Sequence, residues 1–153
     1  MGARGTGAHL ASTLGAVAII ACGPSDADLA RDRAAVERVL AADVSVSSVL
    51  RQADAALATG DREAAVAAVK TKAVPAADAN ANAALALHAT TPWGKARAAD
   101  LTSLTTDRRR SLDAYAAALG SDDGNALLAA IEAQRLIERR ALALWQSVEK
   151  RDP

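Results

Sequence analysis

Alanine makes up more than a quarter of this chain, and this proportion limits what the chain can fold into. The sequence holds 42 Ala among 153 residues, and Leu and Arg, which are also good helix formers, are frequent. No sustained period-2 alternation of apolar and polar residues marks a strand. Because an Ala side chain buries little area, helices rich in Ala have to pack closely to form a core. The composition therefore predicts an all-α protein of closely packed helices.

Apolar residues recur at spacings of three, four and seven in four long segments, which is the pattern of amphipathic helices. Gly60 and the turn at residues 120–123 separate neighbouring segments, and Thr91-Pro92 is typical of a cap followed by Pro at the first helical position. Pro75 lies inside the second segment, where it is expected to kink or split the helix. The predicted helices run from about Asp26 to Thr59, from Arg62 to Ala89, from Trp93 to Leu119, and from the following turn to Lys150. The short links predict an up-down-up-down four-helix bundle, made of two helical hairpins, after an N-terminal signal segment.

Two further interpretations of the helical segments stay open. Residues 53–69 resemble residues 115–131, which fits either a duplicated hairpin or the general likeness of Ala-rich hairpins. The turn at residues 58–61, with Pro75 further on, resembles a tetratricopeptide repeat. The large residues and the repeated period of that motif are absent, so a tetratricopeptide-like adaptor is a minor alternative.

The first 22 residues have the parts of an export signal. A short Gly-rich start carries Arg4, an uncharged apolar run covers residues 10–20, and small residues lead to Cys22. At ~1.5 Å per residue this run reaches only about half of a ~30 Å hydrocarbon core, so a permanent spanning helix is not expected.

The sequence Ile19-Ile20-Ala21-Cys22 resembles the lipobox of bacterial lipoproteins, in which an aliphatic, a tolerant and a small residue precede Cys. The resemblance covers residues 1–22 and implies that Cys22 receives a diacylglycerol and that a signal peptidase cuts between Ala21 and Cys22. Acyl chains such as palmitate would then anchor the protein to a membrane. The implied parts are a signal peptide (1–21), a lipidated Cys with a short tether (22–28) and a helical domain (29–153). Gly23, rather than Asp, after Cys22 implies the outer membrane of the cell envelope, facing the periplasm.

Patterns for catalysis and cofactor binding are missing. His88 is the only His after the signal, and neither a Glu-x-x-His pair nor a Cys-x-x-Cys-His motif accompanies it, which excludes the usual di-metal and haem sites. No Gly-rich phosphate loop and no Ser-His-Asp set is apparent. The formal net charge of zero lacks the basic excess typical of nucleic-acid binding. We therefore expect no catalytic residue, metal or cofactor, and no nucleic-acid partner.

Four polar residues interrupt the apolar stripes of the four predicted helices. Reflected through the turns near residues 60, 91 and 121, they fall within about one helical turn of the same height. Three interpretations stay open: surface positions, a structural polar layer that fixes helix register, or a small-ligand site in the bundle core. The candidate core polar layer consists of Asp43, Asn80, Arg108 and Gln134.

Taken together, these features predict a membrane-anchored envelope lipoprotein without enzymatic equipment. Its helical domain is expected to be a structural or protein-interaction module whose partner is another envelope protein. The alternative is a helical bundle that binds a small ligand at the polar layer. The sequence indicates neither the partner nor the oligomeric state.

Overall fold

The computed structural model describes residues 23–150. The predicted signal peptide, the cleavage site at Ala21 and Cys22, and residues 151–153 lie outside the described residues. The described chain forms α1 (Asp26–Ala58), α2 (Arg62–Ala68), the π-helical turn η1 (Val69–Ala73), α3 (Val74–Leu85), α4 (Pro92–Leu119) and α5 (Gly124–Glu149).

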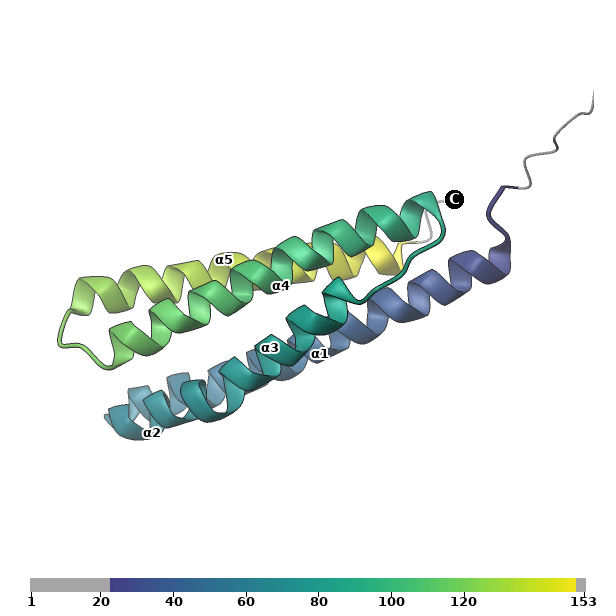
Figure 1. Cartoon of the computed structure of the whole chain (residues 1–153). Helices are drawn as coiled ribbons and strands as arrows, with labels where there is room; N and C mark the ends of the chain where they lie inside the picture. Colours follow the sequence, from purple (N-terminus) through teal and green to yellow (C-terminus); the bar gives the residue numbers. More distant parts are fainter. Residues whose placement is uncertain (1–22, 151–153) are drawn as a thin grey trace, which may run out of the picture.

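The helices form the predicted bundle. Because α2, η1 and α3 follow one another without a break, the molecule consists of four rods, and residues 23–150 contain no strand (Figure 1). Successive rods run in opposite directions and pack lengthwise, so the up-down-up-down arrangement of two hairpins is confirmed. Arg62 donates to the Ser121 carbonyl (2.7 Å) and to the Asp122 carboxylate (3.0 Å), which joins the turns of the two hairpins at one end of the bundle.

The first helix begins inside the segment predicted to be a tether. The Ser25 hydroxyl accepts a hydrogen bond from the Asp28 backbone N–H, and the Asp28 carboxylate accepts one from the Ser25 N–H, which is a capping box. This reciprocal cap satisfies two backbone donors of the first turn. Residues 26–28 therefore belong to α1, as the predicted helix boundary at Asp26 has it, and not to the segment predicted to be a tether.

The second rod contains a wide turn where a kink or break at Pro75 was predicted. The Val74 N–H bonds to the Val69 carbonyl, five residues earlier, in place of the four residues of an α-helix. Pro75 follows directly, and a wide turn relieves the clash of its ring with the carbonyl four residues before it. The rod is therefore continuous, and Pro75 does not split it.

The second rod also ends four residues earlier than predicted. It stops at Leu85, and residues 86–91 form a linker to α4. The sequence offers no Gly or Pro stop signal there, but the linker makes a tertiary contact that a longer helix would lose: the carboxylate of Asp32, on α1, accepts hydrogen bonds from the backbone N–H groups of Thr90 and Thr91.

The predicted turns at Gly60 and residues 120–123 and the predicted cap at Thr91 are confirmed, and Asp61 and Asp123 cap the two remaining helix starts. Gly60 has a φ of 83°, a left-handed conformation that favours Gly, and Asp61 accepts from the Ala64 N–H at the start of α2. Thr91 caps α4 ahead of Pro92, and Asp123 caps α5. These caps fix the positions of the turns.

The tetratricopeptide alternative is wrong. The helices α1, α4 and α5 have 33, 28 and 26 residues. A repeat of ~34 residues that holds two helices leaves fewer than about 17 residues for each. Rods of this length belong to a bundle.

The four rods are not equally close to one another. α1 packs against α4 across the bundle, whereas α5 packs mainly on α4 and touches α1 much less, and α3 makes no contact with α5. The cross-section is therefore a rhombus, with α1 and α4 on its short diagonal. This arrangement opens the side of the bundle between α1 and α5.

Two hydrophobic clusters fill the interior. One, at the end with the two turns, contains many Ala, together with Val46, Leu50, Leu112 and Leu119. The other, at the opposite end, contains Val36, Leu40, Leu101, Leu104, Ile137 and Leu144. Leu29 on α1 and Leu128 on α5 lie outside both clusters and are exposed.

Candidate functional site

A buried ion pair joins α1 to α4 between the two hydrophobic clusters. Asp43 is 2% exposed and Arg108 is 1% exposed. The Arg108 Nε donates to Asp43 Oδ1 (3.2 Å), and Nη2 donates to Oδ2 (2.8 Å). This bidentate geometry offsets part of the free-energy cost of removing two charges from water.

Hydroxyl and amide groups from three helices complete the polar layer. Arg108 Nη2 also donates to Ser47 Oγ (3.2 Å), and Nη1 donates to Gln134 Oε1 (3.4 Å). The Gln134 amide nitrogen donates in turn to Ser111 Oγ (3.0 Å). Each nitrogen of the guanidinium therefore bonds to the protein itself, and so do both ends of the Gln134 amide.

Asn80, the fourth predicted member of the layer, is buried but does not join it. It lies at the same boundary between the clusters, and its Oδ1 has no hydrogen-bond partner within the described residues. The rhombic packing explains the separation, because α3 and α5 occupy its far corners and Asn80 cannot reach Gln134. The structure thus brings together Asp43, Arg108 and Gln134 and leaves Asn80 apart.

A groove runs along the open side of the bundle, and we call it the α1–α5 groove. It consists of two adjoining pockets of about 370 and 380 Å³ that share Glu138. On α1 the groove extends from Leu40 to Ala58, which corresponds to about 27 Å at a rise of 1.5 Å per residue. Asp43 and Gln134 of the polar layer form part of its floor.

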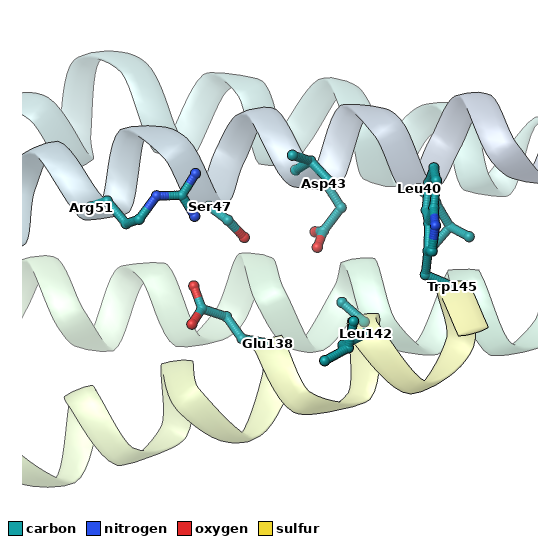
Figure 2. Close-up of a pocket in the computed structure, with 9 residues that line it drawn as sticks. Leu40, Asp43, Ser47, Arg51, Glu138, Leu142 and Trp145 are labelled. Atoms are coloured by element: carbon teal, nitrogen blue, oxygen red, sulfur yellow. The ribbon is translucent and has the colours of Figure 1, made fainter. Parts of the chain in front are cut away.

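The two ends of the groove are apolar. At the first, the Trp145 end, Leu40 of α1 faces Leu142 and Trp145 of α5 (Figure 2). Val44 of α1 also lines this pocket. At the second, the Ile131 end, the main apolar side chains are Leu57 and Ile131.

The middle of the groove is charged. Arg51 on α1 and Glu138 on α5 lie on opposite walls; the Glu138 carboxylate points toward α1, and the Arg51 side chain extends along α1 (Figure 2). Within residues 23–150 neither side chain forms an ion pair. The other charged residues of the two walls have partners, since Asp54 on α1 is bonded to Tyr115 and Arg135 on α5 is paired with Glu132. Each wall therefore presents one charge without an ion-pair partner among these residues, positive on α1 and negative on α5.

The floor near the Ile131 end holds a buried tyrosine. The Tyr115 hydroxyl donates to the Asp54 carboxylate (2.5 Å). Burial, together with this hydrogen bond and the negative charge of Asp54, raises the pKa of Tyr115 far above its ordinary value. The hydroxyl therefore remains a neutral donor at physiological pH.

A second buried carboxylate, Asp32, was not predicted from the sequence. It is 1% exposed and accepts from the Thr91 hydroxyl (2.7 Å) as well as from the two linker N–H groups. Burial by itself raises its pKa, but the hydrogen bonds from Thr91 and Thr90 outweigh burial, and the net pKa lies below the ordinary value of 3.8. Asp32 lies four residues before buried Val36, so the stripe argument that selected Asp43 applies equally to it.

Asp32 also explains a glycine in the first turn of α4. A Cβ added at Gly94 would lie 2.2 Å from Asp32 Oδ2. Only a residue without a side chain lets α4 approach the Asp32 carboxylate this closely. The contact holds the N-terminal end of α4 close to α1, the helix that lies opposite it on the short diagonal.

In the described part of the chain, no group of three or more His, Cys, Asp or Glu side chains is arranged to hold a metal ion. No helix among residues 23–150 has both the length and the apolar character to span a membrane.

Comparison with known proteins gives no match among family models, curated proteins or solved structures. The function has to be inferred from the residues themselves, and the α1–α5 groove is the candidate site.

Proposed function

We propose that this chain is a lipid-anchored protein of the bacterial cell envelope whose bundle binds another envelope protein through the α1–α5 groove. The module is non-enzymatic, and its acyl chains at Cys22 hold it in the outer membrane, facing the periplasm. The observation that supports the binding function is the groove. Its walls expose two large apolar side chains, Val44 (56%) and Leu142 (58%), and apolar side chains clustered in a surface groove are typical of an interaction site.

The hydrogen bonds of the polar layer favour a protein partner over a small ligand. Arg108 and Gln134 bond within the bundle, so they offer a ligand few unused donors. The groove beside them is long, open and apolar at both ends. Small-ligand sites are usually enclosed and compact, whereas a long open groove suits a segment of another chain.

Metabolic labelling with a fatty acid tests the membrane anchor. The wild-type chain should incorporate the label, and Cys22→Ala should abolish both the labelling and the processing. Ser25→Ala is the matched control, because it lies outside the lipobox and removes only a helix cap. Equal labelling of wild type and Cys22→Ala would contradict the lipid anchor.

Photo-crosslinking in cells tests the groove. A crosslinking amino acid at residue 142 should give a discrete, reproducible adduct with one envelope protein. The control position is Leu136, which is on the same helix, is similarly exposed (53%) and lines neither pocket of the groove. The same adducts from both positions, or none from position 142, would contradict binding through the groove.

A further inference from the structure

We propose that the α1–α5 groove accepts an amphipathic α-helix of about five turns, with an acidic residue on one edge of its apolar stripe and a basic residue on the other. This inference rests on the proposed function, since it names the kind of segment that the partner supplies. The length, the alternation of apolar and charged zones and the signs of the charges each contribute to it.

The length of the groove fits a helix. The groove extends about 27 Å along α1, which a helix of about 18 residues spans at 1.5 Å per residue. A helix placed there would lie beside both α1 and α5 and cover the floor between them. It would fill the side of the rhombus that the remaining contacts leave open.

The zones along the groove set the spacing of apolar residues on the incoming helix. Val44 at the Trp145 end, Arg51 in the middle and Leu57 at the Ile131 end are six to seven residues apart on α1, or about two helical turns. A helix alongside therefore needs an apolar side chain about two turns before its charged residues and another about two turns after them. This is the seven-residue spacing of helices that pack lengthwise.

The two charges without ion-pair partners in the described chain, Arg51 and Glu138, determine which charge the incoming helix needs on each edge of its apolar stripe. An incoming helix presents one edge of its stripe to Arg51 and the other edge to Glu138. An acid on the first edge and a base on the second would pair both walls, in the same way that flanking charges select partners in coiled coils. A helix with the same sign on both edges would meet repulsion at one wall.

Synthetic peptides provide the probe. Three 21-residue helical peptides would share one apolar stripe and differ only in the two central edge residues: Glu and Lys in the mixed peptide, Lys and Lys in the basic peptide, and Glu and Glu in the acidic peptide. The full-length chain would be held in phosphatidylcholine nanodiscs. Trp93→Phe leaves Trp145, which lines the groove, as the only Trp, so its fluorescence reports binding.

We expect the otherwise wild-type chain to bind the mixed peptide roughly threefold to tenfold more tightly than either of the others. Arg51→Glu makes both walls acidic and should transfer this preference to the basic peptide, while Glu138→Arg should transfer it to the acidic peptide. This prediction does not depend on the direction in which the peptide helix binds. Reversing the helix exchanges the edges that face α1 and α5, and the basic and acidic peptides carry the same charge on both edges. Leu142→Glu should weaken all binding, and Leu136→Glu should leave it unchanged.

Several results would overturn the proposal. These are the absence of saturable binding of any peptide, a peptide preference that the two charge substitutions do not change, and equal effects of Leu142→Glu and Leu136→Glu. A peptide-free dimer in sedimentation that Leu142→Glu dissociates would assign the groove to a second copy of the chain instead. If the peptides do not bind as expected but position 142 gives a specific adduct in cells, the groove binds a partner protein through a segment other than the proposed helix.

Discussion

At the scale of single residues, the Asp43–Arg108 pair has the largest consequences for the bundle. The pair lies between the two hydrophobic clusters, where an unpaired charge would be costly and a shifted helix would separate the partners. A slip of α4 against α1 by one turn, about 5.4 Å, would break both hydrogen bonds. The pair therefore fixes the lengthwise position of α4 relative to α1. The many small Ala side chains of the core do little to distinguish one position from another.

Removing one partner should destabilise the protein more than removing both. Arg108→Met leaves the Asp43 carboxylate buried without its cation and should lower the free energy of unfolding by about 3–5 kcal/mol. The double variant Asp43→Leu with Arg108→Met replaces the pair with apolar groups and should lose much less. Urea unfolding of the two single variants and the double variant measures the coupling.

Arg110→Met provides the matched control for the ion pair. Its side chain is largely exposed, and its ion pair with Asp107 has a long separation of 3.6 Å, so its loss should change stability by less than about 1 kcal/mol. If Arg108→Met cost as little as Arg110→Met, the ion pair would have no role in stability.

Asp32 should make the bundle sensitive to acid. Its folded-state pKa is below the unfolded value of 3.8, because hydrogen bonds from Thr91 and Thr90 outweigh the effect of burial. The stabilisation is therefore complete above the unfolded pKa and is lost as the pH falls through the lower folded pKa. Asp32→Asn should lower the melting temperature at pH 7 and flatten its acid dependence below about pH 4. A wild-type acid limb that Asp32→Asn leaves unchanged would assign the acid sensitivity to other carboxylates.

At the scale of elements, the wide turn in the second rod follows from the spacing of its buried residues. Ala65, Val69, Ala73 and Ala77 are buried at intervals of four. In a regular α-helix each interval of four residues rotates the side chain by about 40° around the axis, so three intervals would turn the stripe away from the core. The wider π-helical turn at Val69–Ala73 takes up part of this rotation and keeps the stripe facing inward.

Deleting Lys72 should therefore be tolerated. The deletion shortens the interval between Val69 and Ala73 to three residues and should convert η1 into regular α-helix while the buried stripe is kept. Because the wide turn also accommodates the Pro75 ring, the deletion is made in a Pro75→Ala background, where we expect a further loss of less than about 1 kcal/mol in thermal or urea unfolding.

Deleting Ala79 provides the comparison. Ala79 is also exposed, but it lies in the regular part of the rod, where the interval between Ala77 and Asn80 is already three residues. Its loss should turn Asn80 and Ala84 out of the core and cost more than about 2 kcal/mol. Equal costs for the two deletions would show that the spacing does not cause the wide turn.

At the scale of the whole molecule, the rhombic cross-section distributes stability unevenly. α4 contacts every other helix and the wide turn, whereas α5 contacts only α4 and α1. α5 packs extensively on α4, and its only other interface among the described helices is the smaller one with α1. It is therefore the rod that should separate most readily.

Hydrogen exchange followed by mass spectrometry should detect this difference. We expect amides in the middle of α4 to exchange at least about tenfold more slowly than amides in the middle of α5, because opening of α5 leaves the α1–α4 contact intact. Occupation of the groove by a partner helix should slow exchange in α5 selectively. Identical rates in α4 and α5 would mean that the bundle opens only as a whole.

The candidate site was predictable only in part. Asp43, Arg108 and Gln134 were placed at one height by counting residues from the turns, and they do bond to one another. The separation of Asn80 from the other three was not predicted. Counting residues from the turns gives the position of a residue along the bundle axis, but it does not show which helices lie next to one another in the cross-section. Asp32 was overlooked although it lies on the same stripe as Asp43.

The sequence by itself determined the helices, their caps and the order of the four rods, because apolar spacing and cap chemistry are local. Only the tertiary structure decided that α1 approaches α4 and leaves a groove beside α5. That choice depends on the summed sizes of side chains at all the interfaces together, including a close approach at Gly94 that a single methyl group would block. No segment of the chain carries this information alone, and the groove is its direct product.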